Sequence, residues 1–258
     1  MTTWPAESRR KRAVAEVVIV LALSLGQSAL YSIVNIVQRL SRTQALADQT
    51  ATINPPRAEE PIFDLIYQIM NIGFGLVPVV LVIFLLWQPG RPPFRALGFD
   101  LRRPARDVGW GVVLAAAIGI PGILLYLVGH ALGITVTIVP TALGAYWWTL
   151  PVLILAAAKA ALEEEIIVVG YLFTRLREFG WKPWAIIGFS ALLRGSYHLY
   201  QGFGPFIGNV VMGIAFGYAY QRWGRLMPLV VAHFILDVLS FTGYAIVASI
   251  APGFLPGT

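Results

Sequence analysis

The sequence contains no cysteine, and it has few charged residues for its length. The absence of cysteine excludes disulfide frameworks, thiol nucleophiles and cysteine-ligated zinc. Charged residues make up 12% of the 258 positions, about half the share found in a soluble domain. Apolar residues make up 57%, and the mean hydropathy is +0.72. This balance excludes an ordinary soluble domain and a disordered chain, and it indicates a protein that crosses a membrane several times.

The sequence contains several long runs of apolar residues. A membrane-spanning helix needs about 20 mostly apolar residues. Seven stretches meet that need: 14–38, 63–87, 108–133, 144–174, 183–200, 205–222 and 226–250. The fourth is about 30 residues long and exceeds the hydrocarbon core, so we expect it to tilt, protrude or break into two helices. The expected fold is all-α, a transmembrane helix bundle of about seven spans, or eight if the fourth stretch divides.

The ends and loops of this bundle follow from composition. The run after Arg9–Arg12 lasts about 25 residues, longer than the apolar core of a signal peptide, which favours a retained first span. The stretch 39–61 is polar and reads as a loop outside the membrane. We therefore expect residues 1–258 to form a single integral membrane domain.

Lysine and arginine are distributed unequally among the expected loops. If the N-terminus is cytoplasmic, 14 of the 19 basic residues fall in inner segments and only Arg39, Arg42 and Arg57 in outer ones. The positive-inside rule then predicts a cytoplasmic N-terminus and an outer C-terminus. The net charge of +6 is explained in the same way, so no nucleic-acid partner is expected.

Ionisable side chains inside the expected spans are concentrated in the second half of the chain. A charged group near the bilayer centre costs about 3 kcal/mol on insertion scales, so it usually marks a site or a pathway. The groups are Lys159, Glu163, Glu164 and Glu165 in the fourth stretch, Arg194 and His198 in the fifth, Asn209 in the sixth, and His233 and Asp237 in the seventh. The functional core is therefore expected within 144–250.

Helical spacing sorts these groups. Glu163 lies four residues after Lys159, which predicts an ion pair that balances charge inside the bundle. Consecutive glutamates point about 100° apart, so the three do not share one face. Two further pairs at a spacing of four do share a face: Arg194 with His198, and His233 with Asp237.

The polar groups inside the expected spans limit the kinds of reaction that the protein could catalyse. There is no His-Glu-x-x-His zinc motif, no second deep aspartate beside Asp237, and no Gly-x-Ser-Gly nucleophile motif. Glutamate, two histidines and aspartate on three helices suit peptide hydrolysis by an activated water, with a carboxylate as base and polar donors for the oxyanion. Two alternatives stay open. The chain could be an ion-coupled transporter using the buried charges, although it lacks the internal repeats common in carriers. It could also be a non-catalytic membrane scaffold.

Three motifs resemble those of the CPBP family, the CAAX proteases and bacteriocin-processing enzymes, also called the Abi family. Glu164-Glu165, followed by Gly170-Tyr171-Leu172, resembles a first motif Glu-Glu-x-x-x-Arg. The segment ending at His198 resembles Phe-x-x-x-His, and His233 to Asp237 resembles His-x-x-x-Asn/Asp. Order and spacing agree over 144–241.

The resemblance implies an intramembrane endopeptidase of a bacterial-type plasma membrane. It implies that Glu164 is the general base, that His198 holds and activates the water, and that His233 and Asp237 stabilise the oxyanion. The implied substrate is a membrane protein or a lipidated peptide in the bilayer, while the oligomeric state stays open. It favours a mechanism without a cofactor, with zinc as the alternative, held by Glu164, His198, His233 and Asp237.

Two positions depart from the family pattern. Val169 replaces the motif arginine, and Arg194 replaces the motif phenylalanine. An unpaired buried Glu165 would cost several kcal/mol or be forced neutral. We expect Arg194 to supply the missing partner of Glu165 from across the bundle, which adds both residues to the predicted site.

Overall fold

The computed structural model describes residues 6–250 and residue 256, and the side chains of Ala6, Arg9 and residues 244–250 lie outside the described part. The expected cytoplasmic residues before Ala6 and the expected outer C-terminus beyond Ile250, residue 256 apart, are outside it as well.

Helices make up most of the described chain. In order the elements are α1 (Ala6–Ala22), α2 (Leu25–Leu40), the 3₁₀ turn η1 (Leu46–Asp48), β1 (Thr50–Asn54), α3 (Pro61–Gly75), α4 (Val77–Leu85), α5 (Pro93–Ala96), α6 (Pro104–Ala131), β2 (Thr137–Thr141), α7 (Thr149–Glu164), the π-helix η2 (Glu165–Tyr171), α8 (Leu172–Glu178), α9 (Pro183–His198), the 3₁₀ turn η3 (Leu199–Gln201), α10 (Phe203–Trp223) and α11 (Met227–Ile250).

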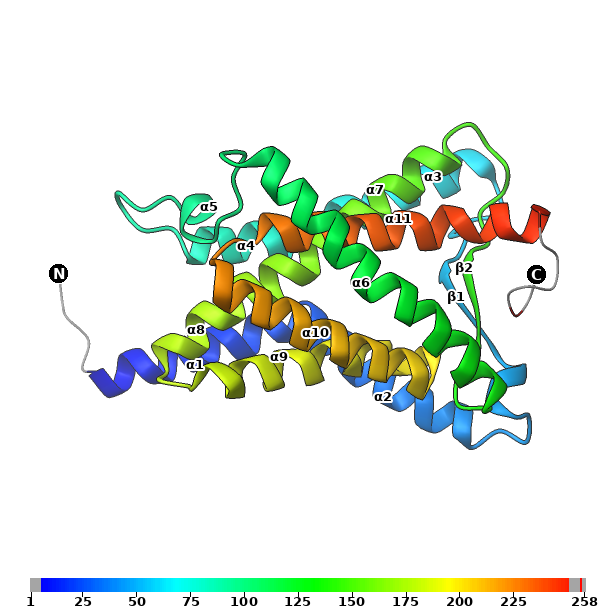
Figure 1. Ribbon diagram of the computed structural model, residues 1–258, viewed down its shortest axis with the longest axis horizontal. Helices are drawn as coiled ribbons and strands as arrows, with labels where there is room; N and C mark the ends of the chain where they lie inside the picture. The colour runs from blue at the N-terminus through cyan, green and yellow to red at the C-terminus, as the bar shows by residue number, and fades with distance from the viewer. Residues whose placement is uncertain (1–5, 251–255, 257–258) are drawn as a thin grey trace.

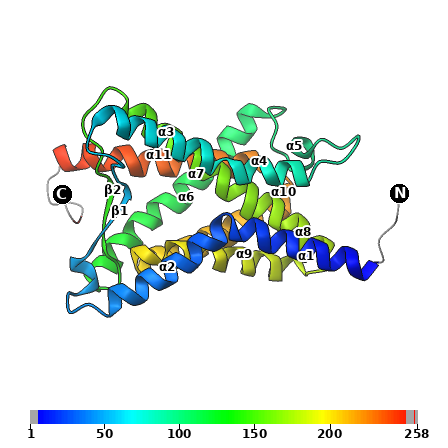
Figure 2. The ribbon, with the colours of Figure 1, turned by 180° about the vertical axis from the view of Figure 1, so that it is seen from behind.

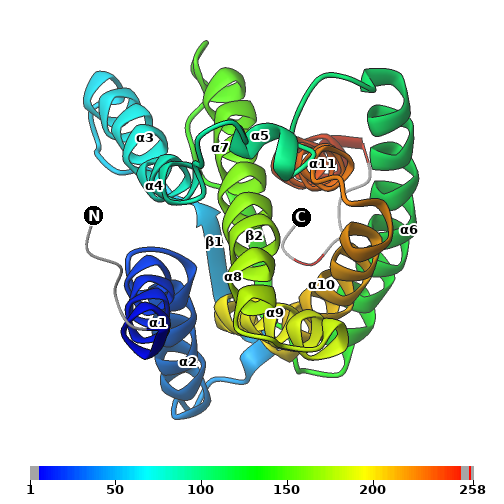
Figure 3. The same ribbon diagram turned by 90° about the vertical axis from the view of Figure 1, so that its left-hand side faces the viewer.

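The long helices lie roughly along the long axis of the molecule (Figure 1). Helices α1, α4, α5 and α8 lie toward the end where the chain begins, and β1, β2 and the end of α11 lie toward the other. Seen from behind, α1 and α2 follow one bent path beside α9 (Figure 2). Viewed along the axis, α7 and α8 run between the α1–α4 side and the α10–α11 side, with α6 outermost (Figure 3). The segment with the most buried charges is therefore the central one.

Length and apolar composition identify three described helices that could cross a membrane: Pro61–Leu85, Pro104–Ala131 and Phe203–Trp223. A fourth is possible if Arg10–Ala22 and Leu25–Leu40, which meet at 54°, form one broken span. Large apolar side chains such as Leu30, Phe84 and Ile120 are between 67% and 73% exposed, as expected for side chains that face lipid. The chain is an integral multi-pass membrane protein, and seven spans stay a prediction.

The fourth apolar stretch neither breaks nor ends early. Helices α7, η2 and α8 follow one another directly, and the change from α to π geometry occurs at Glu165. All residues of the π segment are buried. A π-helix shifts the backbone hydrogen bonds by one residue, and the Ser190 hydroxyl of α9 donates to the Val168 carbonyl at 3.0 Å. Such π segments are frequent at functional sites.

The expectation of an all-α fold is wrong at one place. Strands β1 and β2 form a two-stranded parallel sheet, with Thr50 opposite Thr137 and Asn54 opposite Thr141. Strand β1 lies inside the stretch 39–61 that was expected to be a loop. The fold is therefore mostly helical rather than all-α, because the connection after α2 and the connection between α6 and α7 lie at the same end of the bundle and pair with each other.

At the opposite end, Arg225 joins the α10–α11 turn to the first turn of α6 and to the segment before it. Its guanidinium bonds Asp107, with Nε 2.9 Å from Oδ1, and contacts Asp100 Oδ1 at 3.1 Å. The hydrogen bond to Asp107 and the weaker one to Asp100 raise the pKa of Arg225. Backbone bonds from Leu226 to Leu97 and from Met227 to Gly98 complete the junction. This contact fixes the start of α11, which carries His233.

Candidate active site

Three helical segments bring the sequence-predicted site residues together. The end of α7 and the start of η2 supply Glu164 and Glu165, α9 supplies Arg194 and His198, and α11 supplies His233 and Asp237. Glu165 and Arg194 are fully buried, and Glu164 and His233 are no more than 7% exposed. The arrangement is thus a cluster of charged groups inside the bundle.

Arg194 bridges the two glutamates. Its Nη1 atom lies 3.1 Å from Oε2 of Glu164, and its Nη2 atom lies 2.7 Å from Oε1 of Glu165. The expected contact with Glu165 is therefore present, and the contact with Glu164 is additional. Arg194 also lies over the ring of Phe216, with its guanidinium carbon 5.6 Å from the ring centroid. A planar guanidinium is suited to holding two carboxylates at once, which explains how one arginine serves consecutive glutamates.

His198 lies beside Glu164 without bonding it directly. Its Nε2 atom is 3.9 Å from Oε1 of Glu164. Both ring nitrogens of His198 are shielded from solvent and have no hydrogen-bond partner among the described residues. Two polar atoms at this separation are suited to bridging by a small third group such as a water molecule. This gap leaves hydrogen-bonding capacity unused on both sides, because Oε1 of Glu164 and Nε2 of His198 both lack a hydrogen-bond partner among the described residues.

His233 connects the second glutamate to Asp237. Its Nδ1 atom lies 2.8 Å from Oε1 of Glu165. Its Nε2 atom faces Glu164 Oε2 at 3.9 Å and Asp237 Oδ2 at 3.6 Å. Because an ionised carboxylate only accepts hydrogen bonds, Nδ1 is the protonated nitrogen when Glu165 is ionised. The other nitrogen then points into the space between Glu164 and Asp237.

The remaining polar groups singled out from the sequence lie apart from this cluster. Lys159 Nζ and Glu163 Oε2 form the expected ion pair at 2.8 Å, with side chains 24% and 13% exposed. Asn209 donates to the Pro205 carbonyl in its own helix at 3.0 Å. These groups are satisfied locally and contribute no atom to the site.

Tyr197 belongs to the cluster and was not expected there. Its hydroxyl donates to Oε2 of Glu164 at 2.7 Å, and the side chain is 6% exposed. It lies three residues after Arg194, so the two share a face of α9. An aromatic residue in an apolar helix looks like any core residue in the sequence. The signal that could have found it is this spacing from a buried charge.

The donor atoms of Glu164, Glu165 and His233 lie within 4.8 Å of one another, close enough to consider a metal ion. This set differs from the expected zinc alternative, because Glu165 takes the place of His198 and Asp237. The guanidinium of Arg194 already bonds both carboxylates. A metal ion would have to displace this guanidinium or lie against its fixed positive charge, so these residues do not fit a metal ion.

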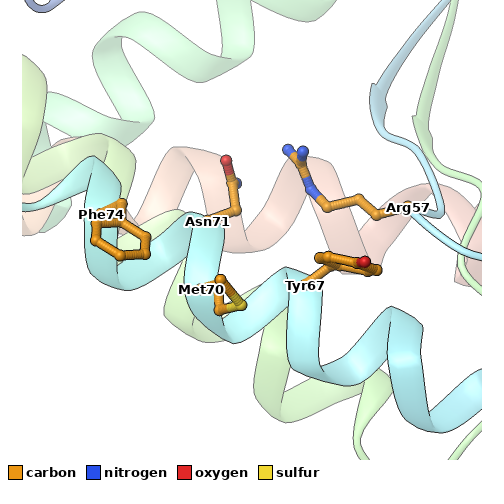
Figure 4. Close-up of a pocket in the computed structure, with 5 residues that line it drawn as sticks. All are labelled: Arg57, Tyr67, Met70, Asn71 and Phe74. Carbon is orange, nitrogen blue, oxygen red and sulfur yellow. The ribbon is translucent and has the colours of Figure 1, made fainter.

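A separate hollow of about 400 Å³ is lined by Arg57, Tyr67, Met70, Asn71 and Phe74 (Figure 4). Four of these residues are on α3, and Arg57 comes from the segment before it. It shares no lining residue with the cluster.

Comparison with known proteins finds one protein family whose model matches this part of the chain. Residues 146–239 match the family model described as type II CAAX prenyl endopeptidase Rce1-like. The matched segment runs from just before α7 into α11 and contains every residue of the cluster. No curated protein and no solved structure matches the chain.

Proposed function

We propose that Glu164 activates the hydrolytic water in this protein, whose residues 146–239 match the model of the Rce1-like type II CAAX prenyl endopeptidase family, a family of peptide hydrolases. The observation that supports this most is the gap between Glu164 and His198. Oε1 of Glu164 and Nε2 of His198 lie 3.9 Å apart, and the histidine nitrogens have no hydrogen-bond partner among the described residues. A water held between them would touch both a base and an orienting ring.

The reaction follows from that position. Glu164 takes a proton from the water as its oxygen attacks the scissile carbonyl carbon, and the carbonyl oxygen becomes an oxyanion. The carboxylic acid so formed then gives the proton to the leaving amine nitrogen as the C–N bond breaks. Glu164 returns to its ionised form, so atoms and charge balance over the cycle.

His233 and Asp237 form the oxyanion side in this proposal. With Nδ1 of His233 bonded to Glu165, Nε2 donates only when the ring is an imidazolium. That charge state is favourable here, because ionised Glu164 and Glu165 would then be balanced by Arg194 and His233. Asp237 can donate to an oxyanion only in its protonated form. Fixed donors of this kind in a site shielded from water are effective in stabilising a transition state.

The substrate proposed is a membrane protein or a lipidated peptide, because the cluster lies inside a bundle with lipid-facing apolar surfaces. We propose seven spans, formed by the membrane-length helices, the bent pair α1–α2, and the passages α7–α8, α9 and α11. Every tryptophan that the structure describes lies near a helix end or in a connection, as in the aromatic belts at membrane interfaces: Trp87, Trp110, Trp147, Trp148, Trp181, Trp184 and Trp223. The proposed location is a bacterial-type plasma membrane, with α5 and the start of α1 on the cytoplasmic side (Figure 1).

The test is hydrolysis of a fluorogenic membrane peptide by the purified protein in lipid. We expect the wild-type protein to cleave it, Glu164→Gln to be inactive, and Glu163→Gln to stay active. Glu163 is the matched control, because it is the neighbouring glutamate and pairs with Lys159 outside the cluster. A folded wild-type protein without activity would favour a non-catalytic scaffold, and an active Glu164→Gln protein would remove Glu164 from the role of base.

A further inference from the structure

The two oxygens of the Glu164 carboxylate have different surroundings. Oε2 accepts hydrogen bonds from the Tyr197 hydroxyl at 2.7 Å and from Nη1 of Arg194 at 3.1 Å. Oε1 has no such bond, and its neighbour is His198 Nε2 at 3.9 Å. The carboxylate is therefore held through one oxygen while the other is presented to His198.

We propose that Tyr197 is a positioning residue that fixes the orientation of the Glu164 carboxylate. This inference rests on the proposed function, in which Oε1 is the oxygen that takes the proton. Rotation about the last bond of a glutamate side chain is broad and only roughly two-fold. A donor on one oxygen restricts that rotation, so the free oxygen keeps its direction toward His198.

Arg194 alone does not provide this restriction. Its guanidinium is shared between two carboxylates, and the shorter contact is to Glu165 at 2.7 Å rather than to Glu164 at 3.1 Å. The bond from Tyr197 is the shortest that Glu164 makes within the cluster, and it comes from a donor that serves no other residue among those described. The hydroxyl is thus the donor specific to Glu164.

Tyr197 also contacts the second member of the water-holding pair. Its ring centroid lies 4.9 Å from that of His198, with the two planes at 45°. Helix α9 ends at His198 and continues as the turn η3, so these two consecutive side chains lie beside each other at the end of the helix. One residue therefore holds the base through its hydroxyl and packs against the imidazole through its ring.

The test separates the hydroxyl from the ring. Tyr197→Phe keeps the packing against His198 and removes only the donor to Glu164. We expect kcat to fall about 10- to 100-fold, as for loss of a hydrogen bond to a charged group, while KM stays unchanged, as for a residue that acts through Glu164 and not on the substrate. The matched control is Tyr220→Phe, which removes the hydroxyl of another buried tyrosine on α10, and we expect it to leave both constants unchanged.

The outcomes distinguish this inference from the proposed function. If the wild-type protein cleaves the peptide and Glu164→Gln does not, the proposed function stands. A Tyr197→Phe protein with wild-type kcat, or with a raised KM alone, would then overturn the positioning role only. A Tyr197→Phe protein that does not fold would assign the hydroxyl to structure and overturn it too. If the wild-type protein is inactive, both proposals fail together.

Discussion

Three consecutive glutamates reach two different cations, and the two arrangements differ in what they leave free. Glu163 pairs with Lys159 on its own helix, one charge to one charge, with both side chains partly exposed. Glu164 and Glu165 share Arg194, which comes from another helix and is fully buried. We refer to these as the local pair and the shared cluster.

The difference shows how a buried charge can stay available for chemistry. The local pair satisfies both partners within one turn of α7. In the shared cluster one cation faces two carboxylates, and the carboxylates have further partners in the imidazole of His233, which contacts Glu165, and the hydroxyl of Tyr197, which donates to Glu164. One oxygen of Glu164 still has no hydrogen bond from a protein group among the described residues. Charge balance across helices can thus stabilise an ionised carboxylate while one of its oxygens keeps no hydrogen bond from the protein.

The largest effect is expected when the shared cation is removed. Arg194→Phe restores the second motif of the family but leaves Glu164 and Glu165 without their common partner. Removing one partner of a buried ion pair costs about 3–5 kcal/mol, so we expect a marked loss of stability and no detectable hydrolysis. Thermal unfolding in detergent together with the peptide assay measures both effects.

Two companion variants sharpen that result. Val169→Arg, four residues after Glu165, should recover stability and part of the activity when added to Arg194→Phe, because it rebuilds a pair within the central helix. Arg194→Lys keeps the charge but lacks the planar fork that holds two carboxylates, so its activity should lie between those of the wild type and Arg194→Phe. A silent Arg194→Phe variant, or no recovery with Val169→Arg, would show that the cluster does not depend on this cation.

The next largest effect concerns the oxyanion side of the shared cluster. Asp237→Ala should lower kcat by about 10²–10³-fold, the usual loss for one oxyanion donor. Asp237→Asn should stay within about ten-fold of the wild type, because its amide donates a hydrogen bond at any pH. Steady-state kinetics of both variants over a range of pH is the measurement. Equal and severe losses in the two variants would instead indicate that the negative charge of Asp237 is essential.

Much of the cluster could be predicted because helical spacing limits which side chains meet. The spacing of four between Arg194 and His198, and between His233 and Asp237, places each pair on one face whatever the rest of the fold does. Because a buried Glu165 needs a positively charged partner, Arg194 could then be predicted as that partner. Both arguments depend only on local geometry and on the cost of burying charge, and both agree with the structure.

What could not be predicted depends on contacts between distant segments. The π geometry at Glu165 is supported by packing and by Ser190 of the neighbouring helix, neither of which is local. The parallel pair of β1 and β2 joins two connections far apart in sequence. Among the described residues, three helices, or four with the bent pair, have membrane length. Helix α9 has only 16 residues, and the 16 residues of α7 pass directly into the π segment, so these passages do not count by length alone.

The smallest effect is expected at the local pair. Variants of this pair test whether it is independent of the shared cluster. Lys159→Met and Glu163→Gln each remove one charge, and the double variant removes both. Because the pair is partly exposed, we expect a coupling free energy of about 1 kcal/mol from the double-mutant cycle. Methionine suits position 159, because the aliphatic part of the lysine lies against Gly75 of α3, where an added Cβ would come within 2.5 Å of Cε.

Activity is the decisive readout for these variants. Since neither Lys159 nor Glu163 contributes an atom to the cluster, all three variants should cleave the peptide within about two-fold of the wild-type rate, whereas Glu164→Gln is inactive. Reversible unfolding in detergent and the peptide assay, applied to the same four proteins, give the coupling free energy and the rates. A Glu163→Gln protein as inactive as Glu164→Gln would mean that the two arrangements act as one network. The free oxygen of Glu164 would then no longer distinguish a catalytic carboxylate from a structural one.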